Sequence, residues 1–266
     1  MMKNSTIIGI ILGLVAVLVG MTLKGAALSN LLNPAAYMII VLGTIASVMI
    51  AFPMSELSKV GKLFKIAFKE QPLMPREQLI ESFMEWASIT RREGLLALEA
   101  KVEDIEDTFL RNGMRMIIDG NDQDFVRDVL LEDISATEDR HKAGALIFTQ
   151  AGTYAPTLGV LGAVVGLIGA LGHMDDMETL AHSIAGAFIA TLLGIFTGYV
   201  LWHPLANKLK RLSKKEVQLR LMMVEGLLSI QSGVSTIAIN QKLSVFLTPT
   251  ERVAMREKEA GAGEKA

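Results

Sequence analysis

Residues 143–172 read AGALIFTQAGTYAPTLGVLGAVVGLIGALG and contain no Asp, Glu, Lys or Arg. About 20 apolar residues in a helix cross the roughly 30 Å hydrocarbon core of a bilayer. Three more stretches lack all four charged residue types: 6–23, 34–52 and 183–202. The 26 basic and 28 acidic residues therefore lie outside these four stretches. The pattern predicts an all-α integral membrane protein with four transmembrane helices.

The composition agrees with this fold class and excludes several functions. Hydrophobic residues make up 51% of the 266 positions, and the mean hydropathy is +0.40. The absence of cysteine excludes disulfides, thiolate chemistry and cysteine-ligated metals. A formal net charge of −2 gives no reason to expect a nucleic acid partner.

The distribution of Lys and Arg predicts how the chain is oriented. Basic residues gather after the second and fourth stretches: Lys59, Lys62, Lys65, Lys69, Lys208, Lys210, Arg211, Lys214, Lys215 and Arg220. The other two connectors carry no charge (25–33) or only acidic charge (173–182). Because basic loops stay on the cytoplasmic side, both termini and the long insertion are expected to face the cytoplasm.

Four segments follow from this orientation. We expect a hairpin of transmembrane helices 1 and 2 (1–52), a cytoplasmic helical domain (53–142), transmembrane helices 3 and 4 (143–203), and a cytoplasmic C-terminal helix and tail (204–266). Lys3 before an apolar run also resembles a secretory signal. Lys24 interrupts its would-be cleavage region, and a second span follows closely, so the hairpin is favoured.

The cytoplasmic insertion is predicted to be helical. Apolar residues recur every three or four positions in two places: Leu79, Phe83, Trp86 and Ile89, and then Phe125, Val129 and Leu130. Asn112-Gly113 and residues 119–122 are expected to be turns or helix ends. The tail after Pro249 is expected to form a short helix that frays into disorder.

Small residues recur along the third and fourth stretches: Gly159, Gly162, Gly166 and Gly169, and then Gly186, Ala190, Gly194 and Gly198. Such spacing lets helix backbones approach closely. Two interpretations remain open, packing of these two helices within one chain and packing against another subunit or a partner helix.

Two prolines and several threonines favour a polar path through the third and fourth helices. Pro156 lies inside the third stretch, where a proline frees a backbone carbonyl. Pro204 follows the fourth stretch, where it is expected to kink or stop the helix. Thr153, Thr157 and Thr191 place hydroxyls at comparable depth, although threonines often bond to their own helix.

Enzyme sites find little support in the sequence. It has no glycine-rich phosphate loop, no His-Glu-x-x-His helix and no intramembrane carboxylate pair. His173, Asp175, Asp176 and His182 could meet in an outer loop, but a solvated loop is favoured over a metal site. Catalytic residues, metals and cofactors are therefore not expected.

Three motifs carry a resemblance to a known family: residues 91–99 (RREGLLALE), residues 156–166, which begin PTLG, and residues 190–194 (ATLLG) leading to Pro204-Leu205-Ala206. In order and spacing they resemble MotA, the ion-conducting stator subunit of the bacterial flagellar motor. ExbB and TolQ, which energise envelope transport of the TonB and Tol type, share the proline and glycine pattern and remain the alternative.

The resemblance implies partners and roles beyond the composition. It implies a homo-oligomer, a pentamer, in the bacterial cytoplasmic (inner) membrane around MotB chains, which supply the ion-carrying aspartate and the peptidoglycan anchor. It implies ion-pathway roles for Pro156, Thr191 and Pro204. Thr157 joins this candidate pathway because its hydroxyl is next to Pro156 in the sequence. It also implies that Arg91 and Glu99 engage the rotor protein FliG. Arg92, expected on the same helix, is included in this rotor-facing surface. A scaffold without ion flux is a third possibility.

The choice of ion depends on Ala163. Sodium-driven relatives typically carry threonine at this position, and a dehydrated sodium ion needs several oxygen ligands. Alanine offers none from its side chain, so we expect a proton-driven channel.

Overall fold

The computed structural model describes residues 5–69 and 73–263. Within these ranges the secondary structure is helical. The chain divides into two compact units: unit 1 contains Met1–Gln71 and Arg140–Leu212, and unit 2 contains Pro72–Asp139 and Ser213–Ala266. Helices α9 (Gln123–Leu171) and α11 (His203–Gln231) each contribute to both units.

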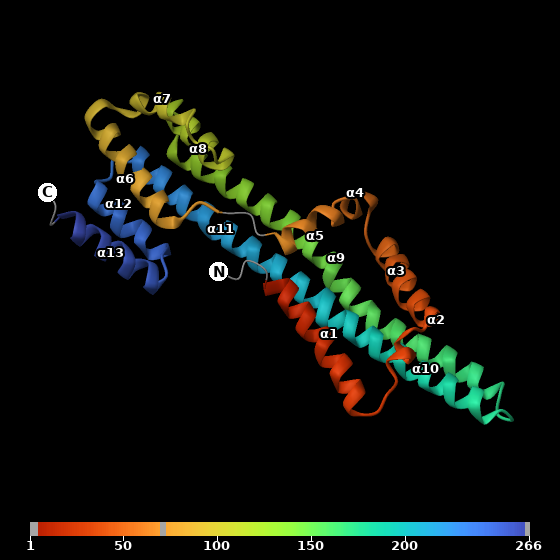
Figure 1. Ribbon diagram of the computed structural model, residues 1–266. Helices are drawn as coiled ribbons and strands as arrows, with labels where there is room; N and C mark the ends of the chain where they lie inside the picture. The colour runs from red at the N-terminus through yellow and green to blue at the C-terminus, as the bar shows by residue number, and fades with distance from the viewer. Residues whose placement is uncertain (1–4, 70–72, 264–266) are drawn as a thin grey trace. The chain divides into compact units, whose positions relative to one another are not determined.

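Unit 1 holds the apolar stretches. Its helices before α9 are α1 (Ser5–Leu23), η1 (Leu28–Leu31), α2 (Pro34–Tyr37), η2 (Met38–Leu42), α3 (Gly43–Ala51), α4 (Met54–Leu57) and α5 (Val60–Phe68). Those after α9 are α10 (Met177–Phe196) and η4 (Thr197–Trp202), which continue into α11. Figure 1 shows α9 running alongside α10.

Four helical segments are long and apolar enough to span a membrane: Ser5–Leu23, Leu28–Ala51, Gln123–Leu171 and Met177–Gln231. They match the four charge-free stretches to within one residue at Phe52 and Gly172, which confirms the predicted spans. Large side chains on α1 remain exposed, with Ile11 at 53% and Leu12 at 63%. Such surfaces suit contact with lipid rather than water.

Two short π-helical stretches were not predicted. They are η2 in the second span and η4 in the fourth, where one residue more than usual is accommodated per turn. Pro204 is the second residue after η4, yet the helix continues through α11 to Gln231. The expected stop at Pro204 is therefore wrong. The proline lacks the N–H of the regular helical ladder, and it lies where the π-helical pattern of η4 changes to the α-helical pattern of α11.

Unit 2 forms around a core of large apolar side chains. Its elements before α9 are α6 (Arg76–Glu93), η3 (Leu95–Leu98), α7 (Glu99–Val102) and α8 (Thr108–Ile118). Those after α11 are α12 (Thr236–Leu243), η5 (Ser244–Phe246) and α13 (Pro249–Gly263). Its largest fully buried side chains include Phe83, Leu110, Met114, Met222 and Met223.

Helix α6 confirms the first apolar rhythm, since Leu79, Phe83 and Trp86 are buried. The second rhythm lies on a helix as predicted, but its face is wrong in part. Leu130 is buried as predicted, but Phe125 and Val129 are exposed, and Val126 and Ile134 enter the core in their place.

The two expected breaks in this region have different outcomes. Helix α8 ends at Ile118 and Gly120 has φ +77°, which confirms the turn at 119–122. Asn112-Gly113 instead lies inside α8. Gly113 is buried there, and a Cβ at this position would collide with Leu227. This glycine therefore allows close packing and does not form a turn.

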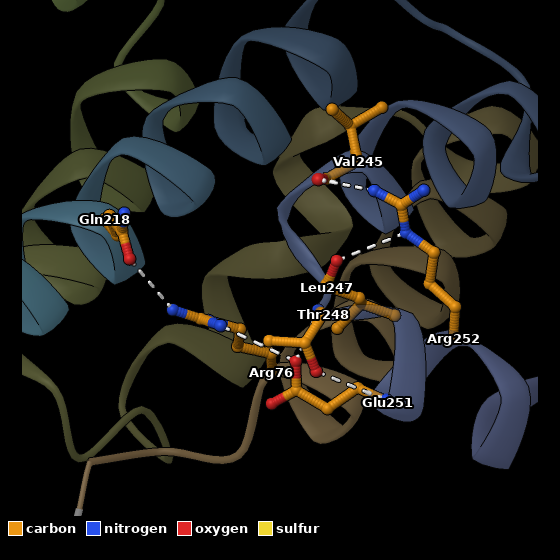
Figure 2. Close-up of polar contacts among 7 residues, drawn as sticks. All are labelled: Arg76, Gln218, Val245, Leu247, Thr248, Glu251 and Arg252. Carbon is orange, nitrogen blue, oxygen red and sulfur yellow. Dashed lines mark hydrogen bonds and ion pairs between the residues drawn. The ribbon is translucent and has the colours of Figure 1, made fainter.

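The C-terminal helix α13 confirms the short helix expected after Pro249 and is fixed at its start (Figure 2). The Thr248 N–H donates to Glu251 Oε2 (2.7 Å), and the Glu251 N–H donates to Thr248 Oγ1 (3.3 Å), a reciprocal capping box. Arg76 of α6 lies 3.6 Å from Glu251. The chain end expected to fray, 264–266, lies outside the described residues.

Candidate functional site

The candidate ion pathway lies where α9 and α10 meet in unit 1. A Cβ on Gly159 would lie 2.8 Å from the Ala190 carbonyl oxygen and 2.9 Å from Gly194 Cα. A Cβ on Gly194 would lie 2.7 Å from the Ala155 carbonyl oxygen. The two backbones are therefore in direct contact, which requires glycine at both positions.

Two more pairs extend this contact. A Cβ on Gly162 would lie 3.2 Å from Ala190 Cβ, and one on Gly166 would lie 3.2 Å from Ala187 Cβ. Of the two interpretations of the small residues, the structure shows packing within one chain for these positions. Gly169 differs, because a Cβ there would meet nothing within 4 Å.

Pro156 follows Ala155 at one end of this contact and faces η4. Because proline has no N–H, the Gly152 carbonyl loses its donor in the helical ladder. A Cβ on Gly198 would lie 2.8 Å from the Gly152 oxygen and 2.7 Å from Pro156 Cγ. The proline, the freed carbonyl and the π-helical stretch therefore come together at one level of the helix pair.

The sequence did not single out Gly152 or His203 at this level. The His203 ring packs against Gly152, with ring atoms 2.9 Å from the place where a Cβ would be. Tyr199 lies beside His203, with ring centroids 5.3 Å apart. The sequence predicted only that Pro156 frees a backbone carbonyl. The residues that pack against this carbonyl depend on the register between α9 and η4.

The threonines all donate to carbonyls of their own helices. Thr191 is half-buried and its Oγ1 donates to the Ala187 oxygen (3.4 Å). Thr157 is exposed and donates to the Tyr154 oxygen (2.7 Å), and Thr153 donates to the Thr149 oxygen (3.1 Å). Each hydroxyl therefore retains acceptor capacity for a further donor.

The remaining two ion-pathway residues offer no polar side chain. Ala163 is half-buried and follows Gly162. Pro204 is exposed and lines a cavity of about 350 Å³ together with Thr6, Gly9 and Lys208. The Lys208 ammonium donates to Thr6 Oγ1 (2.8 Å). No titratable carboxylate belongs to the four charge-free stretches, so a charged ion would find no counter-charge there.

The predicted rotor-facing residues do not share one helix, contrary to expectation. Helix α6 ends at Glu93, and Gly94 has φ +86°, a conformation that favours glycine. Arg91 and Arg92 lie in the last turn of α6, whereas Glu99 begins α7.

All three side chains are nevertheless exposed. Arg92 Nε donates to the Ser88 carbonyl (3.4 Å). Within residues 5–69 and 73–263, none of the three forms an ion pair, whereas Glu85 pairs with Lys101 and Glu103 with Arg115. The three charges are thus available to a partner.

The loop between α9 and α10, which was expected to face outward, shows helix capping. Asp176 accepts hydrogen bonds from the Thr179 hydroxyl (2.5 Å) and from the backbone N–H groups of Glu178 and Thr179, and these bonds lower its pKa. No group of three or more metal-ligating side chains occurs in the part of the chain that the structure describes.

Two family models match the chain: Motility protein A N-terminal over residues 7–94, and the MotA/TolQ/ExbB proton channel family over residues 101–222. The chain is 58% identical to Motility protein A of Bacillus subtilis over 265 residues, covering 99% of this chain and 98% of the relative.

The chain is also similar to solved structures of MotAB. One is the flagellar MotAB stator complex from Bacillus subtilis, with a TM-score of 0.90, 58% identity and coverage of 94% of this chain and 98% of that chain. Another is C. jejuni MotAB, with a TM-score of 0.87, 31% identity and coverage of 92% and 96%. Similarity over the whole length to motility proteins favours them over the ExbB and TolQ alternative. The chain belongs to the motility protein A family, within the MotA/TolQ/ExbB proton channel family.

Proposed function

We propose that the chain is a stator subunit of the bacterial flagellar motor and forms, with MotB, a proton channel that converts ion flow into torque on the rotor. The full-length similarity to Motility protein A carries this proposal. The geometry of unit 1 supports it, because a tightly packed helix pair with hydroxyls and a freed carbonyl, but without a carboxylate, suits half of a pathway.

MotB supplies the missing half. Its aspartate carries the ion and its far end holds the peptidoglycan. Several copies of this chain, five in this proposal, surround the MotB helices. Each charge that crosses 100 mV releases about 2.3 kcal/mol, and this energy drives rotation of the ring relative to the anchored MotB.

Thr191 and Thr157 present hydroxyl oxygens toward this pathway, and Pro156 and Pro204 allow the helices to bend as the MotB carboxylate changes charge. Ala163 offers no side-chain oxygen, which disfavours a sodium site. A proton needs only the partner carboxylate and a path of hydroxyls or water.

The protein lies in the cytoplasmic membrane with both termini inside. Residues 53–142 and 204–266 form its cytoplasmic part. Arg91, Arg92 and Glu99 face the rotor protein FliG there, and their charges direct the contact. Their exposure and their lack of ion pairs among the described residues support this role.

Swimming tests this function. A bacterium that lacks its own MotA, but retains a matching MotB, receives the gene for this chain. We expect swimming to return, to be independent of external sodium at constant proton-motive force, and to stop with a protonophore. Speed that rises steeply with sodium and survives the protonophore would contradict the proton assignment. Recovery of TonB- or Tol-dependent functions instead of swimming would support the ExbB and TolQ alternative.

A further inference from the structure

Unit 1 contains an apolar cavity of about 540 Å³ that the ion pathway does not use. Phe64, Phe148 and Trp202 form part of its wall, and their ring centroids lie 5.0 to 6.1 Å apart. Of its lining residues only Thr44, Ser58 and Thr197 carry a hydroxyl. An apolar cavity of this kind does not hold ordered water, and its volume is that of a small-ligand site.

From the basic residues that follow the second span, we infer that the cavity lies where hydrocarbon meets the cytoplasmic headgroups. Its lining follows the second span from Ile40 to Met49, within three residues of the end of α3 at Ala51. It then continues over α4 and α5 from Met54 to Phe64. A ligand that contacts both the second span and the lining from α4 and α5 needs an apolar body in the hydrocarbon and a polar end at the headgroups.

Positive charge accompanies the polar end of this lining. Lys59 lies between the lining residues Ser58 and Val60, and Lys62 follows one turn later; both are exposed. Lys65 and Lys69 continue the row on α5 and after it, and Glu56 is the one acidic residue among 53–69. Neither Lys59 nor Lys62 forms an ion pair with a described residue.

We propose that this cavity binds an anionic phospholipid, with one acyl chain among the aromatic rings and the phosphate near Lys59 and Lys62. Charge favours an anionic lipid over the N-terminal transmembrane helices of a second copy of this chain, because Glu56 and Glu70 are the only acidic residues in 1–71. Anionic lipids of the cytoplasmic leaflet supply negative charge at this level on every side of the protein.

Trp202 provides a direct probe of occupancy, since it lines the cavity and the chain has only one other tryptophan, Trp86. The Trp86→Phe chain is reconstituted into phosphatidylcholine vesicles. Its fluorescence is measured as the fraction of brominated phosphatidylglycerol or brominated phosphatidylcholine increases. The proposal predicts that brominated phosphatidylglycerol quenches Trp202 at much lower mole fractions.

The lysines and the cavity are tested separately. Lys59→Gln with Lys62→Gln should weaken the preference for phosphatidylglycerol about fivefold for each lysine removed. Lys214→Gln with Lys215→Gln on α11 makes the same change of charge in unit 2, outside the cavity lining, and should leave the preference unchanged. Val48→Phe, which fills the cavity from α3, should reduce quenching by both lipids.

Equal quenching of the lysine-intact chain by the two brominated lipids would overturn the proposal, because the cavity would then lack headgroup selectivity. No quenching by either lipid would also overturn it and would assign the cavity to protein. If Trp86→Phe does not fold, the difference between the native chain and Trp202→Phe gives the same comparison. The result is independent of motor function, since it requires only the chain in a bilayer.

Discussion

Unit 1 brings helix backbones into contact at Gly159 and Gly194, whereas unit 2 surrounds Phe83 with large side chains. In unit 2 apolar area is removed from water, which is the main stabilising contribution to a soluble core. In unit 1 lipid is as apolar as the side chains, so close van der Waals packing must hold the helices together. Small residues therefore stabilise the packing of unit 1, whereas large apolar residues stabilise unit 2.

The largest expected effect is in unit 2. Phe83 is fully buried, packs edge-on against Trp86 at 5.3 Å and fills the space that Gly226 leaves open. Phe83→Ala should lower the stability of unit 2 by about 3 to 5 kcal/mol through lost burial and a cavity. Hydrogen exchange of α6 in the full chain measures this change. Phe125→Ala is the control, because Phe125 is 53% exposed; an equal loss there would contradict the assigned core.

A single added methyl group tests unit 1. Gly194→Ala places a Cβ 2.7 Å from the Ala155 carbonyl oxygen and from Gly159 Cα, so the backbones must separate. We expect a loss of about 1 to 3 kcal/mol, measured as a lower melting temperature of the detergent-solubilised protein. Gly169→Ala is the matched control, since nothing lies within 4 Å. If both variants melt as the native chain does, close packing does not hold α9 to α10.

Charge reversal at the proposed rotor surface should have a smaller energetic effect but a visible one on motility. Arg91→Glu replaces attraction by repulsion, worth on the order of 1 kcal/mol for an exposed pair. We expect slower swimming, an unchanged amount of protein in the membrane, and partial rescue by the opposite reversal in the rotor protein. Lys214→Glu makes the same change elsewhere on unit 2. Loss of the protein from the membrane with Arg91→Glu would instead indicate a structural role.

The smallest effect concerns the docking of α13. The Thr248 N–H, the largest cause, holds the pKa of Glu251 below its ordinary value of 4.5. The carboxylate therefore stabilises the folded state fully above the ordinary pKa, and this stabilisation is lost as the pH falls through the lowered pKa. Because the group is partly exposed, the contribution is small.

The absence of cysteine makes this contribution measurable. A spin label on Ala254→Cys should become more mobile as the pH falls below the ordinary glutamate range. Glu251→Gln should make the label mobile at neutral pH and remove the acid dependence. Glu257→Gln is the control. An unchanged acid response in Glu251→Gln would show that another group holds α13.

The four spans could be predicted because charge is absent from 143–172 and its counterparts, a pattern that needs no knowledge of packing. The α6 core face followed from the spacing of Leu79, Phe83 and Trp86. Other features depend on what a residue touches. Gly113 and Gly94 are both glycines in the insertion, yet one makes room for Leu227 inside a helix and the other ends a helix at φ +86°.

The candidate site was predictable to the same extent. Pro156 signals a freed carbonyl from sequence alone, but its apposition to Gly198 depends on the register of two helices. The π-helical stretches η2 and η4 have no residue pattern that distinguishes them from the neighbouring α-helical segments, so they could not be predicted. Arg91 and Glu99 were predicted as exposed charges, but the break at Gly94 places them on separate helices.

The central claim is that this chain provides a channel wall and needs a carboxylate from another chain. Its direct test is proton uptake into vesicles that contain the purified chain alone or the chain with MotB, driven by a potassium diffusion potential. We predict no uptake above protein-free vesicles for the chain alone, and uptake with MotB that is lost when the MotB aspartate is replaced by asparagine. Robust uptake by the chain alone would contradict the account.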